Sequence, residues 1–302
     1  MRAVPLEPAA PHWRAWAAVA ITLVIWASFL IVTRAAARAE LTPTDVGLLR
    51  FIPAAILFAP VWLRVGPLPR SIGWRGITHI ALPGGFLFVG LLASGAQFAP
   101  VADSAVFAPS MLPLYVAILS YFMLGERFSG LRIAGFALIL VGAMSVGGWE
   151  AITRGESGAW RGHLLVTFAT MCWAIYTVNY RKTDLSPMEG AMLLAFWSAL
   201  GFGLLGLVTP MNLWDAAPSF LAFQVLMQGV LAGYVSTITY SYALQNILPS
   251  RVAAAAAMVP VMAALGGWIW LDEPIGWIKA AGIAVVTCGV LLASGAVGKP
   301  RR

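Results

Sequence analysis

Ten long apolar stretches, separated by short segments rich in charge, glycine and proline, run through this 302-residue chain. A helix needs roughly 20 predominantly apolar residues to cross the hydrocarbon core of a bilayer. Each stretch has about this length and therefore predicts a transmembrane helix. The predicted spans are 14–33, 45–64, 76–98, 102–123, 129–148, 162–181, 188–209, 219–243, 251–271 and 276–296. The fold class that follows is an all-α membrane protein with ten transmembrane helices.

The composition excludes several other classes of protein. Apolar residues make up 60% of the chain and charged residues only 10%. In soluble domains, about 45–50% of the residues are apolar and about 25% are charged. One soluble core of this size cannot bury so much apolar surface. The net charge of +7 comes from dispersed Lys and Arg residues rather than a basic, aromatic-rich run, so we expect no nucleic-acid partner. The expected partners are the lipid bilayer and a small-molecule substrate, and the sequence leaves the oligomeric state open, a monomer included.

The chain lacks the common sequence signatures of catalysis and metal binding. It contains no Walker-type loop, HExxH or GxSxG motif. Both cysteines, Cys172 and Cys288, fall inside apolar stretches and have no metal-ligand spacing. We therefore expect no enzyme, no catalytic residue, no cofactor and no metal.

The distribution of basic residues predicts the orientation in the membrane. If the N-terminus is cytoplasmic, 13 of the 19 Lys and Arg residues lie on the cytoplasmic side and five on the outside. The positive-inside rule then places both termini in the cytoplasm of a bacterial-type inner (plasma) membrane. Arg2 and Arg14 precede the first span as in a signal peptide, but its length favours a retained helix.

An internal repeat divides the chain into two halves. Trp26 and Arg34 recur as Trp173 and Arg181, 147 residues later. The same offset relates Pro113 to Pro260, Glu126 to Glu273, Gly135 to Gly282 and Gly142 to Gly289, and an offset of 144 relates Pro43 and Asp45 to Pro187 and Glu189. The predicted repeats are residues 1–150 and 158–302. Because each holds five spans, an odd number, the second must enter the membrane in the opposite sense, and such inverted repeats place a substrate site between them.

These repeated residues resemble the EamA-type half of the drug/metabolite transporter superfamily. The resemblance rests on Trp26 and Arg34, Arg50-Phe51, Pro113, Leu124-Gly125-Glu126 and Gly135 to Gly142, and again on Trp173, Arg181, Pro260, Leu271-Asp272-Glu273, Gly282 and Gly289. The halves differ in that Leu194 stands at the counterpart of Arg50, and Asp272 at that of Gly125. The resemblance implies a ten-helix transporter whose relatives often export amino acids or other small metabolites.

We therefore expect a transporter that works by alternating access on small organic metabolites. Amino acids are the first candidates for its substrate. A transporter of nucleosides or sugar derivatives is the first alternative. A non-transporting membrane scaffold or sensor is the second. A membrane-embedded enzyme would need acids or histidines at one depth, and the sequence shows no such set.

Arg50 is the basic residue that lies clearly inside a predicted span. A charge at this depth is costly and should face a cavity or a partner. Its planar guanidinium suits a substrate carboxylate, although it could instead bond to backbone carbonyls or extend toward the membrane surface.

Aromatic and amide side chains near the middle of the spans are candidates for the cavity wall. Trp26 and Trp173 form a symmetric mid-span pair, unlike tryptophans at the membrane interface. Packing against lipid or neighbouring helices is the alternative for each. The other candidates for substrate binding are Phe86, Tyr115, Tyr176, Gln228 and Tyr240.

Prolines inside two spans predict hinges. Pro109 and Pro113 lie in the fourth span and Pro260 in the ninth. Each removes one helical hydrogen bond, which frees the carbonyls of Ala105, Pro109 and Ala256 for a side chain, water or a ligand. A static kink is the alternative to a hinge.

All 12 carboxylates fall at predicted helix ends or in loops. The first span contains none, which disfavours an antiporter for cationic drugs. His79 and His163 also lie near helix ends and are expected at the membrane interface. The repeat predicts two gating ion pairs: Arg34 with Glu273 on the outer side, and Glu126 with Arg181 on the cytoplasmic side.

Overall fold

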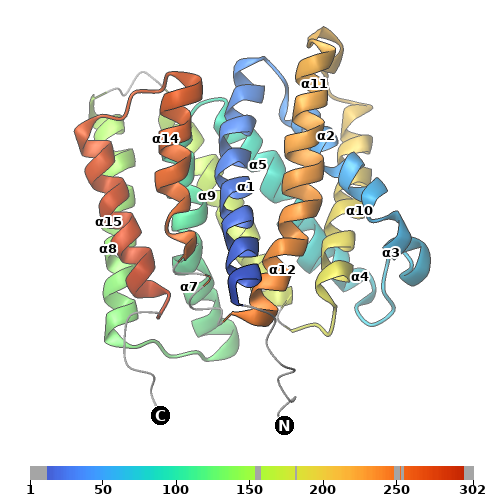
Figure 1. Ribbon diagram of the computed structural model, residues 1–302, viewed down its shortest axis with the longest axis horizontal. Coiled ribbons are helices and arrows are strands. Elements are labelled where there is room, and N and C mark those ends of the chain that lie inside the picture. The colour runs from blue at the N-terminus through green and yellow to red at the C-terminus, as the bar shows by residue number, and fades with distance from the viewer. Residues whose placement is uncertain (1–11, 154–157, 181, 248–251, 253–254, 296–302) are drawn as a thin grey trace.

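The computed structural model describes residues 12–153, 158–180, 182–247, 252 and 255–295, and every regular element in this part of the chain is helical. The helices lie side by side in one bundle (Figure 1). The elements are α1 (His12–Arg38), α2 (Pro43–Leu57), α3 (Ala59–Val65), α4 (Gly73–Gly76), η1 (Ile77–Leu87), α5 (Phe88–Ala96), α6 (Val101–Ala105), η2 (Val106–Ser110), α7 (Leu112–Leu124), α8 (Gly130–Thr153), α9 (Ala159–Tyr180), α10 (Pro187–Gly206), η4 (Leu213–Asp215), α11 (Pro218–Gln224), η5 (Val225–Val235), α12 (Ser236–Asn246), α14 (Val259–Leu271) and α15 (Trp277–Ala293).

Several of these helices are long and apolar enough to cross a membrane. Within the described residues there are five, or six if the bent pair α2 and α3 is one span. The five cover Trp13–Arg38, Gly73–Ala96, Val101–Met123, Pro187–Gly206 and Pro218–Tyr240. Shorter apolar helices cover Gly130–Val146, Val259–Leu271 and Trp277–Ala293. The described part of the chain is therefore all-helical and has the helices of a membrane protein, and the full count of ten spans stays a prediction.

The second predicted span, 45–64, is not one straight helix. It consists of α2 and α3, which meet at Phe58 with a bend of 64°. Pro60 lies in the first turn of α3, and a proline has no N–H to continue the helix across this point. The sequence pattern marked the apolar length correctly but missed this break.

The third, fourth and eighth predicted spans contain π-helical segments, in which the backbone bonds are looser than in an α-helix. These are η1, η2 and η5. Pro109 lies inside η2, and the carbonyl of Ala105 accepts a hydrogen bond from Ser110 Oγ at 3.0 Å. A neighbouring side chain therefore takes up one acceptor that the prolines were expected to free.

Pro113 and Pro260 begin helices rather than interrupt them. Pro113 lies in the first turn of α7 after a turn at Met111, and Pro260 lies in the first turn of α14 after Met258. A missing N–H costs nothing in a first turn. Both spans are thus divided at a turn next to the proline, and whether the chain moves there stays a prediction.

The two halves share local features at matching positions. Thr42 and Asp45 form a capping box at the start of α2, and Ser186 and Glu189 form one at the start of α10. A left-handed residue ends both α7 and α14, Gly125 in one and Asp272 in the other.

The glycines that recur seven residues apart bring α8 and α15 together. A Cβ on Gly142 would lie 2.8 Å from the carbonyl oxygen of Gly282, and one on Gly289 would lie 2.8 Å from that of Gly135. Side chains at these positions would clash with backbone. The role of these glycines is therefore close helix packing.

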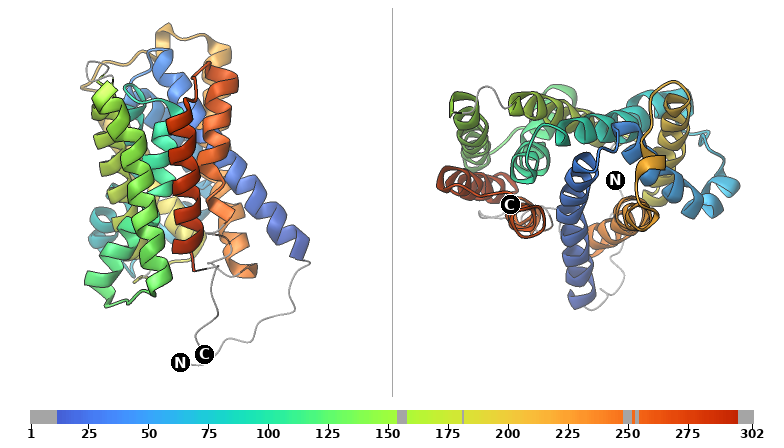
Figure 2. Two further views of the ribbon diagram at one scale, coloured as in Figure 1. Left: turned by 90° about the vertical axis from the view of Figure 1, so that its left-hand side faces the viewer. Right: turned by 90° about the horizontal axis from the view of Figure 1, so that it is seen from above.

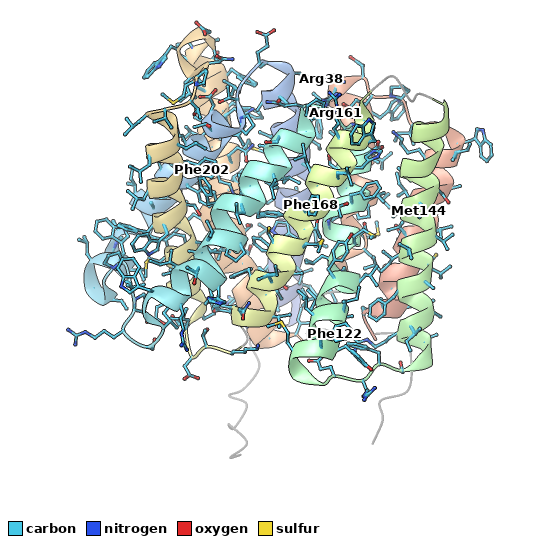
Figure 3. All side chains as sticks on the ribbon, turned by 180° about the vertical axis from the view of Figure 1, so that it is seen from behind. Arg38, Phe122, Met144, Arg161, Phe168 and Phe202 are labelled. Atoms are coloured by element: carbon cyan, nitrogen blue, oxygen red, sulfur yellow. The ribbon has the colours of Figure 1, made fainter. Side chains whose placement is uncertain are left out.

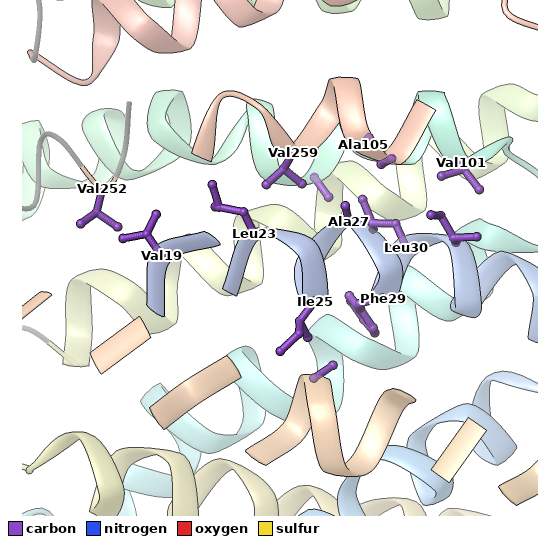
Figure 4. Packing of buried hydrophobic residues seen from close by; sticks show 14 of the residues in the cluster. Val19, Leu23, Ile25, Ala27, Phe29, Leu30, Val101, Ala105, Val252 and Val259 are labelled. Carbon is purple, nitrogen blue, oxygen red and sulfur yellow. The ribbon is translucent and has the colours of Figure 1, made fainter. Parts of the chain in front are cut away.

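Helix α1 lies within the bundle, where it packs against α12, α14 and η5 (Figure 2). One of its faces carries Val19, Leu23, Ala27 and Leu30 toward α14 and α6, while Ile25 and Phe29 point to the other side (Figure 4). The first span is thus surrounded by protein on several faces, and it places its middle residues where helices of both halves meet.

Candidate functional site

A cavity lies between the halves, beside the middle of α1. Its empty space is about 600 Å³, including the part continuous with solvent. The first half provides wall residues from α1, α2, α5, η2 and α7, and the second half provides them from α9 and α14. The lining residues are Trp26, Phe29, Leu30, Arg50, Phe88, Ala108, Pro109, Leu112, Thr170, Trp173 and Val259.

Arg50 is the one charged residue among these described lining residues. Its guanidinium carbon lies 4.2 Å from the centre of the Phe29 ring, a cation–π distance. Its Nε and Nη1 atoms are buried, and neither has a hydrogen-bond partner in the described structure. A buried charged donor without an acceptor is unfavourable. The cavity wall therefore contains a buried cation with two N–H donors that no acceptor in the described structure satisfies.

Tryptophans from both halves line the cavity. Trp26 on α1 packs against Tyr240 with ring centres 5.1 Å apart, and Trp173 on α9 packs against Phe88 at 4.7 Å. Such tilted contacts hold large rings in place. Thr170 adds a hydroxyl to the wall, but this hydroxyl already bonds to the carbonyl oxygens of Val166 and Phe107. The wall is thus apolar and aromatic apart from Arg50.

The structure places the other predicted binding residues outside this lining. Phe86 packs on Phe202, with ring centres 4.6 Å apart, and Tyr176 packs between Trp173 and Tyr180. Tyr240 is not among the lining residues but packs on Trp26, which is. The remaining two are Tyr115, which packs against the core around α8 and α15, and Gln228, whose Nε2 donates to Thr33 Oγ1 at 3.1 Å.

The three predicted hinges differ in their distance from the cavity. Pro109 lines it directly. Pro113 and Pro260 each follow a lining residue, Leu112 and Val259, by one position. The helix starts of α7 and α14 therefore border the cavity.

An ion-pair cluster joins the two halves at the end of the bundle where α1 finishes. Glu273, which follows α14, accepts hydrogen bonds from Arg34 Nε and Arg38 Nη2, both at 3.0 Å. Its second carboxylate oxygen accepts from the backbone N–H of Val101 at 2.7 Å. Arg34 also donates to the carbonyls of Ala96 and Gln97. The structure thus brings Arg34 and Glu273 together, and their action as a gate is a proposal.

A second charged cluster lies beside the first. Asp103, in the first turn of α6, has no exposed surface. Its Oδ2 lies 2.9 Å from His163 Nε2 on α9, and its Oδ1 lies 2.6 Å from Lys279 Nζ on α15. Because a carboxylate only accepts hydrogen bonds, the Nε2 atom carries the proton that it shares with Asp103. We refer to Asp103, His163 and Lys279 as the Asp103 cluster.

The structure adds the burial of two of these residues. His163, expected at the membrane interface, is 8% exposed and stacks on Phe107 with ring centres 4.7 Å apart. Asp103 begins a helix, as expected of the acids, and is fully buried. Its partners lie 60 and 176 positions away in the chain, so no local sequence signal pointed to the contact. His79, in contrast, is exposed, and its position at the membrane interface stays a prediction.

The two clusters form one layer over the cavity. Arg34 follows the lining residue Leu30 by four positions on α1, and His163 precedes Thr170 by seven on α9. A helix rises 1.5 Å per residue, so the layer lies about 6–10 Å from the cavity along these helices. Figure 3 shows Arg38 and Arg161 at this end and Phe122 at the opposite end.

The second predicted gate is only partly described. Glu126 follows the left-handed residue that ends α7, and its backbone N–H donates to the carbonyl of Ser120 at 3.2 Å. Arg181 lies outside the described residues. Their pairing stays a prediction.

Comparison with known proteins agrees with this architecture. The chain is 25% identical to an uncharacterized transporter, YoaV, of Bacillus subtilis (82% of this chain, 85% of the relative). It is 25% identical to a probable terminal-alkyne amino-acid exporter of Streptantibioticus cattleyicolor (92% of each). A solved crystal structure, 18% identical, matches with a TM-score of 0.62 over 92% of this chain and 96% of that one, which supports the fold alone. The sequence profile of the EamA-like transporter family matches residues 13–148 and again 160–295, and the chain therefore belongs to this family of membrane transporters.

Proposed function

We propose that this protein moves a small organic metabolite bearing a carboxylate, with amino acids as the first candidates, across the inner membrane by alternating access. The observation that carries the proposal is the guanidinium of Arg50, whose buried Nε and Nη1 atoms have no partner in the described structure. A substrate carboxylate would supply the missing acceptors with two parallel bonds.

The rest of the cavity wall supports an amphipathic substrate. Apart from Arg50 and Thr170 the described lining is apolar, and it contains no carboxylate. The faces of Trp26 and Trp173 suit an apolar side chain or, through cation–π attraction, the ammonium group of an amino acid. The relative from Streptantibioticus cattleyicolor, whose name describes a probable exporter of an amino acid, supports the same class.

The proposed mechanism rests on ten helices arranged as two inverted repeats of five, residues 1–150 and 158–302. Support comes from the two family matches, from the paired capping boxes of α2 and α10, and from the reciprocal glycine contacts of α8 and α15. Inverted repeats allow one half to rock against the other around a central site. The cavity wall, drawn from both halves, is suited to such a movement.

The ion pair of Arg34 and Glu273 is proposed as the gate of one end. It joins α1 of the first half to the segment after α14 of the second, about one helical turn from the cavity. Separating the halves at this end would break it. Glu126 and Arg181 are proposed as the corresponding pair at the cytoplasmic end.

A ligand panel on the purified protein tests the proposed substrate class. Amino acids, their amides, nucleosides and sugar derivatives are compared by thermal shift, and the ligands that bind are then followed in liposome flux. A ligand at 100 times its Kd stabilises a protein by about 2.7 kcal/mol, a readily detected shift. We expect carboxylates to stabilise the protein and amides to fail. Stabilisation by nucleosides or sugars alone would favour that alternative class, and binding without flux would favour a sensor.

A further inference from the structure

Gln228 carries a buried polar atom that the described structure leaves unused. The residue lies on η5 and has no exposed surface. Its side-chain nitrogen, Nε2, has partners, whereas its side-chain oxygen, Oε1, has none among the described residues. Buried polar atoms are nearly always hydrogen-bonded, so such an exception calls for an explanation. Polar side chains within membrane helices are costly and commonly mark a functional site.

The hydrogen bonds of Thr33 fix the orientation of this amide. The hydroxyl of Thr33 donates to the carbonyl of Phe29 at 2.7 Å, so its oxygen can only accept from Gln228. The atom of Gln228 that lies 3.1 Å from this oxygen must therefore be the donor, Nε2. Nε2 also lies 3.5 Å from Oε1 of Gln224, four residues earlier in the chain. Both partners lie on the nitrogen side of the amide, and Oε1 of Gln228 turns away from them.

The packing of η5 on α2 brings Gln228 near Arg50. A Cβ on Gly229 would lie 2.9 Å from the carbonyl oxygen of Leu49, and one on Gly233 would lie 3.3 Å from that of Arg50. The backbone of η5 next to Gln228 therefore touches the backbone of α2 next to Arg50.

Both side chains extend to the same face of α1. The guanidinium of Arg50 lies over the ring of Phe29, which leaves α1 on the side away from α14 (Figure 4). Gln228 bonds to Thr33, four residues further along α1. Residues four apart share one helix face and are separated by about 6 Å along the axis. The unpaired donors of Arg50 and the unpaired oxygen of Gln228 therefore lie about one helical turn apart, where α1, α2 and η5 meet.

An α-amino acid presents the two complementary groups at this spacing. Its carboxylate accepts hydrogen bonds, its ammonium donates them, and one carbon atom joins the two. With hydrogen bonds of about 2.7–3.0 Å at each end, one such head group can span the gap between Arg50 and Gln228. The neutral amide oxygen suits an ammonium, because it accepts a charge-assisted hydrogen bond without adding a negative charge that would compete for Arg50.

Other occupants and other positions for the ammonium are the alternatives. Calcium and magnesium prefer several oxygen ligands, and the described residues contain no group of three His, Cys, Asp or Glu side chains that could hold a metal ion. The cavity wall offers an ammonium the faces of Trp26 and Trp173 and the hydroxyl oxygen of Thr170. Binding measurements on variants of Gln228 separate these positions from its amide oxygen.

We propose that Oε1 of Gln228 accepts a hydrogen bond from the ammonium group of an α-amino acid whose carboxylate is bound by Arg50. The proposal rests on the carboxylate substrate proposed above and narrows it to compounds that carry an ammonium group next to the carboxylate. Gln228 is not among the lining residues of the cavity. Binding therefore requires the ring of Phe29, which lines the cavity and packs on Arg50, to turn aside.

Equilibrium binding to the purified full chain in detergent tests this role. Leucine, methionine and phenylalanine are each compared with the carboxylic acid that lacks the amino group. The measured quantity is the preference, which is the ratio of the two dissociation constants in each pair. Gln228→Leu removes the oxygen and keeps a side chain of similar size. We expect it to lower the preference for the amino acid by roughly 10- to 150-fold, the range for one hydrogen bond to a charged group, and to leave binding of the deamino acid nearly unchanged.

Gln224→Leu is the matched control. Gln224 is also fully buried, but both ends of its amide have partners: Nε2 donates to the carbonyl of Val32 at 3.2 Å, and Oε1 accepts from Gln228. Its loss should lower the unfolding temperature without changing the preference. Thr33→Val removes the hydrogen bond that orients the amide of Gln228, and it should lower the preference by a smaller factor than Gln228→Leu. If Gln228→Leu does not fold, Thr33→Val decides the question.

The outcomes separate an ammonium site from a structural amide. If Gln228→Leu weakens binding of the amino acid and the deamino acid equally, Gln228 only supports Arg50 or the helix packing, and the proposal is wrong. An unchanged preference would place the ammonium elsewhere on the wall and would also overturn it. If the wild-type protein binds both members of each pair equally tightly, the ammonium site is wrong and the carboxylate substrate stands. If it binds neither member of any pair, the proposed substrate class itself is wrong.

Discussion

At the scale of single residues, Arg50 sets the sharpest prediction about the substrate. Arg50→Lys keeps the charge but loses the fork that binds both carboxylate oxygens. We expect the substrate constant to rise by roughly 10- to 150-fold, which corresponds to about 1.5–3 kcal/mol for a hydrogen bond to a charged group. Binding of carboxylate ligands to both proteins measures the effect. The uncharged amide of the same ligand is the control, and an equal loss for the amide would contradict a carboxylate contact.

Sequence reasoning reached some residues of the candidate site and missed others. Trp26, Arg50, Pro109 and Trp173 were predicted and line the cavity together, because an unusual residue type in mid-span is a local signal. Phe29, Phe88 and Thr170 line it as well, but they are ordinary residues for a membrane helix and carry no such signal. Asp103 was missed because its burial depends on His163 and Lys279, which only the folded chain brings near.

At the scale of helices, the packing of α8 on α15 predicts a clear difference between two glycines of α8. A Cβ at Gly135 would lie 2.7 Å from the carbonyl of Gly289, whereas a Cβ at Gly130 meets nothing within 4 Å. Gly135→Ala should therefore destabilise the protein by about 1–3 kcal/mol, the cost of overpacking. Gly130→Ala should be neutral or slightly stabilising. Thermal unfolding in one detergent compares the two, and equal unfolding temperatures would argue against the close contact.

The helices themselves show what an apolar pattern can and cannot predict. The lengths and order of the predicted spans follow from apolar runs, because the bilayer requires about 20 such residues. The division of the second span at Phe58 lies next to Pro60, and the π-helical segments η1 and η5 depend on how the backbone bonds within the helix. A hydropathy pattern registers neither the proline nor the backbone bonding.

At the scale of the whole molecule, the opposite orientation proposed for the two halves predicts which loops face the cytoplasm. Reporter fusions after residues 70, 127 and 302 should give a cytoplasmic signal, and fusions after 40 and 155 an external one. The excess of Lys and Arg on the first side is the physical reason. A cytoplasmic signal at 155 would mean that the halves run parallel, and the inverted-repeat proposal would then be wrong.

The charged layer over the cavity predicts how strongly each of three substitutions should open this end of the protein. Glu273 accepts from three donors, namely Arg34, Arg38 and the N–H of Val101, so Glu273→Gln weakens all three contacts and removes the negative charge that the two arginines share. Loss of one partner of a buried pair costs about 3–5 kcal/mol. Much of this free energy is lost by the closed state, because the contacts form there. Arg34→Gln leaves Glu273 with two donors and should have a smaller effect. The side chain of Arg38 is 42% exposed, and an exposed pair contributes only about 0–1 kcal/mol.

The open fraction is measured by electron paramagnetic resonance distances between spin labels at Phe98→Cys and Trp277→Cys, after Cys172 and Cys288 are replaced by serine. It should rise most in Glu273→Gln, less in Arg34→Gln and least in Arg38→Gln. An exchange of Arg34 and Glu273 should not restore closure, because a guanidinium at position 273 would face Arg38 and the N–H of Val101. The pairing is better tested by Arg34→Gln together with Glu273→Gln. If the pair acts as a gate, the double variant opens little more than Glu273→Gln alone, since the interaction is already lost. Fully additive effects would mean that the two side chains act independently at this end of the molecule.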